Sequence, residues 1–368
     1  MSVLRRVVAA AHGSIDPAAL RAEGFSPDAT IDFSSNQSPL GAAPGVAGAV
    51  SAAVINAYPD PHASEFCAAV AERYGLSADC VVAGNGSTEL IRLIAQLALA
   101  PGDTALSLGP SFGEYEVATR LAGARFAEVR LAHGGAGAGF RCDEPVLRTA
   151  LAELSPRLCW LCSPNNPTGA ALPPALTAAL VRDYSHTVFV LDEAYCGLFA
   201  TPQWSRALLA EGDLLVLRSM TKSWGLAGLR LGYVVAAPET AAGLRAAAPP
   251  WNVNACAQAA GVRALADSGH HQRALQLLES ERDRLMGVLG SAGWTVEPSS
   301  AGFFLVRVGS AAEARRDLLE HGCLVRDCAS FGLPEYVRVS PRLRPHNDRL
   351  LAAFAALSVP PHPAAQED

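Results

Sequence analysis

The sequence predicts an α/β protein: a large domain with a mainly parallel sheet between helices, followed by a smaller α+β domain. Short apolar runs such as Leu158–Cys162 and Leu214–Leu217 recur up to Pro249, and helical patterns separate them. Strands that are apolar over their whole length are typical of parallel sheets covered on both faces. Beyond residue 252 the strands are shorter and the helical stretches longer, which indicates the second domain.

Length, composition and charge limit the class of protein. The chain has 368 residues, of which 50% are hydrophobic and 17% charged, so it is globular and long enough for two domains. A formal net charge of −6 argues against nucleic acid or an anionic membrane as the main partner. No apolar stretch reaches the roughly 18 residues of a membrane span, and the run before His12 is too short for a signal peptide. We therefore expect a cytoplasmic protein.

The large domain is expected at residues 41–262, and its elements alternate along the chain. Its strands are predicted at 81–84, 103–108, 126–131, 158–162, 187–191 and 214–217. Its helices are predicted at 64–74, 87–97, 113–122 and 173–184.

The small domain is expected at residues 263–368, and the polar N-terminal segment 1–40 is expected to pack with it. One helical stretch is predicted over 255–289, with further helices at 311–320 and 347–356. Strands are predicted at 303–307, 323–326 and 336–339. The Pro- and Ala-rich tail 359–368 is expected to be frayed.

Cys159 and Cys162 stand in a C-x-x-C pattern, which is half of a common metal site. They fall on a predicted strand, where residues three apart point to opposite faces, and no second pair or nearby histidine completes a tetrahedral set. We therefore interpret both as core residues and expect no metal.

Side chains able to bind a ligand follow the predicted strands of the large domain. In sheets of this kind, ligands bind at the carboxyl ends of the strands. Lys222 alone, in Ser-Met-Thr-Lys, fits an ordinary surface lysine at least as well as a reactive amine. The coincidence of several such strand ends favours one shared site. These candidates are Ser87, Phe112, Asn166, Asp192 and Lys222.

Pyridoxal 5′-phosphate needs the contacts that these strand ends offer. Its aldehyde needs an amine for a Schiff base, which Lys222 can provide. Its pyridine nitrogen needs a carboxylate, and Asp192 is the first polar residue after an apolar run. Its phenolate oxygen needs donors, for which Asn166 and Tyr195 are available.

The cofactor phosphate needs a helix N-terminus, hydroxyl groups and a cation. A short strand turning through glycines into a helix at residues 86–89 fits this role, although an ordinary strand–turn–helix fits it equally well. The cofactor ring needs an aromatic partner, for which Phe112 is the first candidate and Tyr115 the second. The candidates for the phosphate are Gly86, Ser87, Thr88, Ser219, Thr221 and Arg230.

Three motifs carry a resemblance to a known family. Pro-Asn-Asn-Pro-Thr-Gly at 164–169, Asp-Glu-Ala-Tyr at 192–195 and the lysine segment 219–232 resemble, in this order, class I and II aminotransferases of fold type I. The match covers nearly the whole chain. It implies a pyridoxal-phosphate enzyme in which Lys222, Asp192 and Tyr195 are catalytic. It also implies a homodimer with shared active sites, in which Tyr58 reaches the cofactor phosphate of the neighbouring subunit.

Two branches of this family resemble the chain most. Residues 225–230 and 325–327 resemble histidinol-phosphate aminotransferase, whereas His12-Gly13 and the segments 32–36, 250–254 and 328–331 resemble threonine-phosphate decarboxylase of cobalamin biosynthesis. Both branches act on phosphorylated amino-acid-like substrates. The chain departs from the decarboxylase pattern at Ser14 and from the aminotransferase pattern at Gln37.

The resemblance also implies where a substrate is bound. Arg338 matches an arginine that grips the substrate carboxylate, and Arg326 matches a contact to the substrate phosphate. Asn36 and Asn166 are the remaining substrate candidates. Arg342 and Arg344 follow nearby and fit a solvated surface equally well.

Three hypotheses about function follow. The first is a transaminase that acts on an amino acid or a phosphorylated amino-acid-like substrate through Lys222. The second is a decarboxylase of the threonine-O-phosphate type, which differs in the bond held perpendicular to the cofactor ring. The third is a non-catalytic ligand-sensing domain, which we consider least because the 40 residues before the first motif are too few for a DNA-binding segment.

Overall fold

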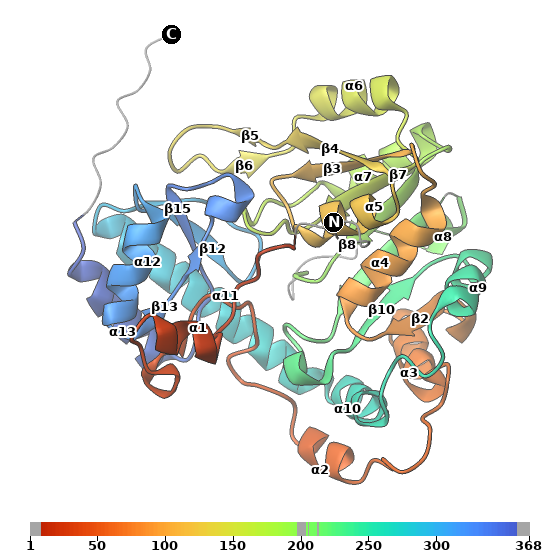
Figure 1. Ribbon diagram of the computed structural model, residues 1–368, viewed down its shortest axis with the longest axis horizontal. Coiled ribbons are helices and arrows are strands. Elements are labelled where there is room, and N and C mark those ends of the chain that lie inside the picture. The colour runs from red at the N-terminus through yellow and green to blue at the C-terminus, as the bar shows by residue number, and fades with distance from the viewer. Residues whose placement is uncertain (1–8, 197–203, 205, 212, 359–368) are drawn as a thin grey trace, which may run out of the picture.

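The computed structural model describes residues 9–196, 204, 206–211 and 213–358, and it has the predicted α/β class (Figure 1). A seven-stranded sheet forms the large domain, in the order β2-β10-β9-β8-β7-β3-β4. The strands are β2 Val81–Gly84, β3 Thr104–Gly109, β4 Arg125–Arg130, β7 Leu158–Cys162, β8 Val188–Asp192, β9 Leu214–Ser219 and β10 Gly232–Val235.

The sheet is mainly parallel, as predicted. Only β10 runs antiparallel to its neighbours β2 and β9, whereas the pairs from β9 through β4 are parallel. Strand β10 was not predicted from the sequence, because it is short and begins at the end of the glycine-rich stretch 225–232. A two-stranded hairpin, β5 Ala132–His133 and β6 Phe140–Arg141, extends from β4.

Two apolar clusters cover the two faces of the sheet, which shows why inner strands such as β7 are apolar over their whole length. Along β7 the side chains alternate: Cys159 and Leu161 belong to one cluster, and Trp160 and Cys162 to the other. Both cysteines are buried, so the interpretation as core residues is confirmed. The helices are α2 Val46–Ser51, α3 Ser64–Tyr74, α4 Ser87–Ala98, α5 Glu114–Leu121, α6 Glu144–Leu154, α7 Pro174–Asp183, α8 Arg206–Glu211, α9 Pro238–Ala247 and α10 Ala255–Ala266.

The C-terminal elements form a second body around a four-stranded antiparallel sheet in the order β11-β12-β15-β14. The blue elements in Figure 1 show this group beside the red helix α1. Its strands are β11 Thr295–Val296, β12 Phe304–Arg307, β14 Arg326–Asp327 and β15 Tyr336–Val339. Its helices are α11 Ser268–Ser291, α12 Ala311–Glu320 and α13 Arg344–Ala355.

The N-terminal segment contacts this second body. After α1 Pro17–Ala22, strand β1 Ile31–Asp32 pairs in parallel with β13 Cys323–Leu324. Short 3₁₀ turns occur at Pro27–Ala29, Ala78–Cys80, Ala227–Leu229 and Ala329–Phe331. The domain boundaries near residues 40 and 262 stay a prediction.

One helical prediction is wrong in detail. The stretch 255–289 is not one helix, because α10 ends at Ala266 and α11 begins at Ser268. Asp267 separates them, and its carboxylate caps α11 by accepting a hydrogen bond from the His270 N–H at 3.0 Å. No helix within the described ranges is long and apolar enough to cross a membrane. The predicted frayed tail 359–368 lies outside the described residues.

Candidate active site

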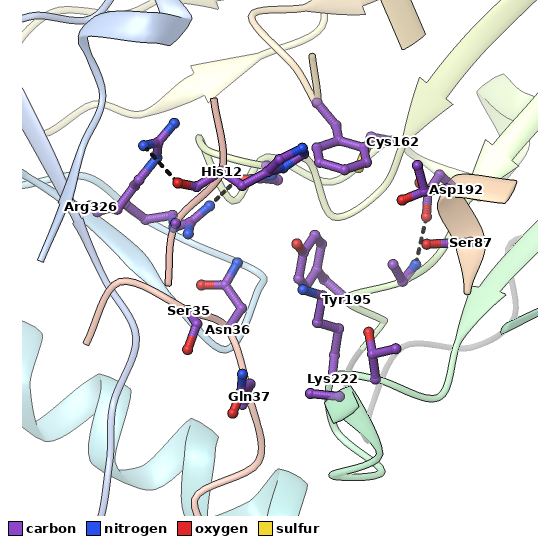
Figure 2. A pocket seen from close by; sticks show the side chains of 18 of the residues that line it. His12, Ser35, Asn36, Gln37, Ser87, Cys162, Asp192, Tyr195, Lys222 and Arg326 are labelled. Atoms are coloured by element: carbon purple, nitrogen blue, oxygen red, sulfur yellow. Dashed lines mark hydrogen bonds between the residues drawn. The ribbon is translucent and has the colours of Figure 1, made fainter. Parts of the chain in front are cut away.

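A cavity of about 330 Å³ lies at the carboxyl ends of the parallel strands, between the large sheet and the C-terminal elements. Figure 2 shows Lys222, Tyr195 and Asn36 around its centre, with Asp192 and Ser87 on one side and Arg326 and His12 on the other. Most of the predicted site residues therefore come together. Those that line the cavity are Asn36, Ser87, Thr88, Phe112, Asn166, Asp192, Tyr195, Thr221, Lys222, Arg230, Arg326 and Arg338.

Two predicted residues lie directly behind this lining. Gly86 caps α4 with φ of 77°, and a Cβ at this position would lie 2.8 Å from Nη2 of Arg230. The glycine therefore allows the guanidinium group to lie against the start of the helix. The Ser219 hydroxyl is buried and lies 2.7 Å from the hydroxyl of Thr221, which itself faces the cavity.

Tyr58 is the predicted site residue that lies apart from the cavity. Its side chain is 78% exposed and stacks on Trp251, with ring centroids 4.3 Å apart. Trp251 follows Pro249–Pro250 and has φ of 55°. Within one chain, Tyr58 does not contribute to the cavity.

Asp192 ends β8 and is buried beneath the cavity. Its Oδ2 accepts a hydrogen bond from the Tyr115 hydroxyl at 2.7 Å, and its Oδ1 accepts one from the Ala194 N–H at 2.9 Å. Burial raises the pKa of Asp192, and these hydrogen bonds oppose that effect. A cation placed against this carboxylate would favour its ionised form.

The structure distinguishes the two aromatic candidates for the ring face. Tyr115 is fully buried, stacks on Trp160 with centroids 5.0 Å apart, and holds Asp192. Phe112 is only partly buried and meets Tyr115 edge to face at 5.7 Å. Both rings line the cavity, and Phe112, which also lies 5.8 Å from the His12 ring, is the more exposed of the two.

Lys222 follows β9 and projects into the cavity near Tyr195. Its Nζ lies 5.8 Å from the centre of the Tyr195 ring. Its backbone carbonyl accepts a hydrogen bond from the Ser38 N–H at 3.1 Å, which connects the lysine segment to the N-terminal segment. The lysine therefore lies where the large sheet and the N-terminal segment contact each other.

Arg338 on β15 is a buried cation at the cavity wall. Its Nη1 donates to Oδ1 of Asn166, and its Nη2 donates to the Ser34 carbonyl at 2.6 Å. Its Nε is buried and has no hydrogen-bond partner among the described residues. Burial lowers the pKa of Arg338, so the surroundings disfavour its charge. An anionic ligand would compensate this charge.

Arg326 and His12 close the opposite side. Arg326 donates to the carbonyls of Ala11 at 3.0 Å and His12 at 3.3 Å, while Nε2 of His12 lies 3.0 Å from the Glu114 carboxylate. The N-terminal segment is therefore fixed to both parts of the molecule. His12 contributed only to a resemblance at the level of sequence and was not predicted as a cavity residue.

Comparison with known proteins identifies the family. The sequence profile described as aminotransferase class I and II matches residues 29–354. The chain belongs to this aminotransferase family. It is similar to histidinol-phosphate aminotransferase of Symbiobacterium thermophilum, with 38% identity over 331 residues that cover 89% of this chain and 90% of the relative.

Solved structures agree with the fold of the aminotransferase. The chain resembles histidinol-phosphate aminotransferase from Sinorhizobium meliloti in complex with pyridoxal-5′-phosphate, with a TM-score of 0.81, 25% identity and coverage of 93% and 94%. It also resembles L-threonine-O-3-phosphate decarboxylase from Porphyromonas gingivalis, with a TM-score of 0.76, 27% identity and coverage of 88% and 98%. The predictions of a fold-type I aminotransferase and of its cofactor are confirmed.

The residues of the aminotransferase fit pyridoxal phosphate on physical grounds. Asp192 is a buried carboxylate whose raised pKa calls for a cation, and a protonated pyridine nitrogen is one. The start of α4, next to Arg230, is the kind of site that binds phosphate. Lys222 supplies the amine in the same cavity.

The structural role of one polar residue of the aminotransferase was underestimated from the sequence. Arg342 was expected to fit a solvated surface equally well, but it is partly buried and donates to backbone carbonyls of residues 32–37. No sequence motif signals such contacts, because any residue provides a carbonyl group.

Proposed function

We propose that this enzyme transfers the amino group of a phosphorylated amine of the histidinol-phosphate class to a keto acid. The observation that carries the proposal is the cavity itself, in which the Lys222 amine shares one space with the guanidinium groups of Arg326 and Arg338. One guanidinium can bind the substrate phosphate and the other a carboxylate of the keto acid or its amino acid. The names of the relatives support this substrate class.

The cofactor would be held by the strand ends. Lys222 supplies the amine for its aldehyde, and Asp192 supplies the carboxylate for its pyridine nitrogen. Asn166 and Tyr195 supply donors for its phenolate oxygen. Its phosphate would be bound by Ser87, Thr88, Thr221 and Arg230, with Gly86 and Ser219 behind them, and its ring would contact Phe112.

The chain's own groups then direct the reaction. The bound cofactor supplies an electron sink for the pair released at the substrate Cα. The Nζ of Lys222, where it is not itself bonded to the cofactor, can take the proton from the substrate Cα as a general base. Arg338 orients the substrate so that this Cα–H bond faces Lys222, and Asn36 and Asn166 contact the substrate beside it.

The experiment measures amino transfer from L-histidinol phosphate to 2-oxoglutarate by the holoenzyme. We expect glutamate formation with wild-type protein and none above background with Lys222→Ala. The cofactor of the wild type should stay on the chain after borohydride reduction and denaturation, whereas that of Lys222→Ala should not. Wild-type protein that holds the cofactor but forms no glutamate would refute the proposed substrate.

A second candidate function is decarboxylation of a phosphorylated amino acid such as O-phospho-L-threonine. Two of the segments that resemble the decarboxylase line the cavity, and this favours the second function. Their cavity residues are His12, Gly13, Ser35 and Asn36. The two reactions differ in whether the Cα–H or the Cα–carboxylate bond is held perpendicular to the cofactor ring. Incubation with O-phospho-L-threonine tests this function, because carbon dioxide release without keto-acid formation would support it and its absence would exclude it.

We also propose a cytoplasmic homodimer in which Tyr58 reaches the cofactor phosphate of the partner subunit. The exposed apolar side chains of Val54, Ile55 and Tyr58 support an interface there. Sedimentation should give a dimer. Mixed dimers of Lys222→Ala and Tyr58→Phe subunits should regain activity, because one of their two sites carries neither change; no recovery from two impaired variants would contradict shared sites.

A further inference from the structure

The segment 32–38 brings Asn36 into the cavity without any regular secondary structure beyond Asp32. The Asp32 carboxylate bonds the N–H groups of Ser34 and Ser35 at 2.8 and 3.1 Å, which folds the start of the segment. Ser38 bonds the Lys222 carbonyl at its end. The path between these two points must be fixed by other groups.

Arg338 bonds the Ser34 carbonyl, and Arg342 provides the contacts on both sides of Asn36. The Nε of Arg342 donates to the Asp32 carbonyl, its Nη1 to the Gln37 carbonyl at 3.0 Å, and its Nη2 to the Ser35 carbonyl at 2.7 Å. Nη2 also lies 3.0 Å from the Ser35 hydroxyl. The two carbonyl groups on either side of Asn36 are therefore bound to one rigid guanidinium.

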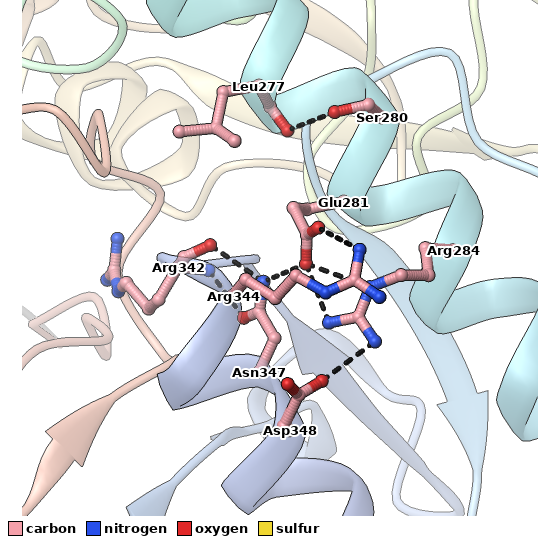
Figure 3. Close-up of polar contacts among 8 residues, drawn as sticks. All are labelled: Leu277, Ser280, Glu281, Arg284, Arg342, Arg344, Asn347 and Asp348. Atoms are coloured by element: carbon pink, nitrogen blue, oxygen red, sulfur yellow. Dashed lines mark hydrogen bonds and ion pairs between the residues drawn. The ribbon is translucent and has the colours of Figure 1, made fainter.

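Arg342 is itself held in place from behind. The Asn347 carboxamide accepts a hydrogen bond from the Arg342 N–H and donates one to the Arg342 carbonyl, both at 2.7 Å. The same carboxamide donates to the buried Glu281 at 2.8 Å, and Arg284 pairs with Glu281 at 2.7 Å. Figure 3 shows this network behind Arg342, whose guanidinium points away from it toward the N-terminal segment.

The Asn36 carboxamide has no hydrogen-bond partner in the described part of the chain, although both its oxygen and its nitrogen are buried. Buried amides are nearly always bonded, so this one is available to a ligand in the cavity. We propose that Arg342 is a positioning residue, which fixes the backbone on both sides of Asn36 so that this free carboxamide meets the substrate. The substrate part of this inference rests on the proposed function.

Arginine suits this role better than lysine. Its planar group carries five N–H donors in a fixed arrangement, and here they reach acceptors on three residues. An ammonium group at the same position keeps the charge but cannot hold separate carbonyls in fixed relative positions. Arg342→Lys therefore tests geometry separately from charge.

The first measurement does not depend on any substrate. Hydrogen–deuterium exchange of the holoenzyme is followed in the peptide that covers residues 33–38, in wild type, Arg342→Lys and the control Arg344→Lys. Arg344 lies two residues away and its side chain is 65% exposed. We expect exchange roughly tenfold faster in Arg342→Lys alone. Equal exchange in all three proteins would overturn the inference.

The second measurement is a double-mutant cycle on KM for L-histidinol phosphate. Asn36→Ala should raise KM roughly tenfold because it removes the hydrogen bond between Asn36 and the substrate, and Arg342→Lys should do the same because it leaves Asn36 out of position for that bond. If Arg342 acts through Asn36, the double variant has the KM of Asn36→Ala alone. Multiplication of the two effects to roughly a hundredfold would overturn the inference. If Arg342 only stabilised the fold, Arg342→Lys would lower the folded fraction, and its effect on KM would stay independent of the effect of Asn36→Ala.

Failure of the two proposals can be told apart. If wild-type protein does not convert L-histidinol phosphate, the proposed substrate is wrong, and the exchange measurement still decides the role of Arg342. If Arg342→Lys does not fold, Asn347→Ala replaces it, because it releases the Arg342 backbone and leaves the guanidinium in the chain. Unchanged exchange over 33–38 in folded Asn347→Ala would then count against the inference.

Discussion

The Tyr115 hydroxyl and the Asp192 carboxylate form a buried hydrogen bond of 2.7 Å between the first turn of α5 and the end of β8. The second carboxylate oxygen accepts from the Ala194 N–H. Both oxygens of Asp192 are thus oriented by the protein. A carboxylate fixed in this way needs little rearrangement when a cationic ring nitrogen approaches it.

Tyr115→Phe should therefore destabilise the cofactor-free protein. The change leaves a buried carboxylate oxygen without its donor, at a cost of about 1–3 kcal/mol in the free energy of unfolding. Urea denaturation measures this loss. The control is Tyr184→Phe, whose hydroxyl donates to the Arg148 carbonyl at 3.2 Å in a partly exposed position and should matter less. Equal losses in both variants would contradict the assigned role of Tyr115.

Gly86→Ala should weaken cofactor binding. The new Cβ would lie 2.8 Å from Nη2 of Arg230, and the backbone there has φ of 77° and ψ of 165°, a conformation nearly restricted to glycine that costs an alanine about 1–3 kcal/mol. We expect the Kd for pyridoxal phosphate to rise at least tenfold in a fluorescence titration. Gly243→Ala is the control, since no atom lies within 4 Å of its added Cβ within α9, and it should leave that Kd unchanged.

Arg338→Lys should impair catalysis without unfolding the protein. A lysine keeps the charge but cannot bond Asn166, Ser34 and a ligand anion in one plane. We expect kcat/KM for the keto acid to fall roughly a hundredfold, equivalent to about 3 kcal/mol. Arg349→Lys, in an exposed part of α13, serves as the control. An unchanged KM and kcat in Arg338→Lys would refute a contact between Arg338 and the substrate.

His271 should make the stability of the protein depend on pH. It stacks on Trp224 with centroids 3.7 Å apart and bonds Ser223, and burial, with Arg73 and other cations nearby, lowers its pKa to about 3. Below pH 6.5 the unfolded chain binds a proton that the folded chain does not, so stability falls as the pH falls from about 6.5 toward 3.

His271→Phe retains an aromatic ring against Trp224 and removes this titration. Between pH 6.0 and pH 4.5 the variant should lose about 2 kcal/mol less of its free energy of unfolding than the wild type. Urea denaturation at a series of pH values gives both curves. Parallel curves would show that His271 does not carry the acid sensitivity.

The sequence predicts the structure well where a local apolar run forms a strand and a site residue follows that strand directly. The run Leu158–Cys162 is apolar on both faces because helices cover both faces of the sheet, and β7 has these bounds. Asp192 and Lys222 follow such runs, and parallel strands bring their ends to one edge. The mainly parallel sheet and the cavity-lining residues at its strand ends were therefore predictable.

Contacts between distant segments were not predictable in the same way. Tyr115 could be recognised as an aromatic residue near the ring, but its bond to Asp192 depends on the packing of α5 against β8. Arg342 bonds backbone carbonyl groups that lie 305 to 310 residues away along the chain. Every residue has such a carbonyl group, so no residue type in the sequence indicates the contact. The break at Asp267 was hidden because the helical pattern continues on both sides of it.

The pairing of β1 with β13 has a consequence for how the chain is made. Residues 31–38 are synthesised before the seven-stranded sheet, whereas Cys323, Arg338 and Arg342, which contact this segment, are synthesised after it. The seven-stranded sheet can form as soon as β10 has emerged, since all its strands precede residue 236. During synthesis the strand ends next to Asp192 and Lys222 thus precede Arg338 and Arg342, and a chain truncated before Arg342 retains the Lys222 amine but lacks the guanidinium that bonds the carbonyls of Ser35 and Gln37.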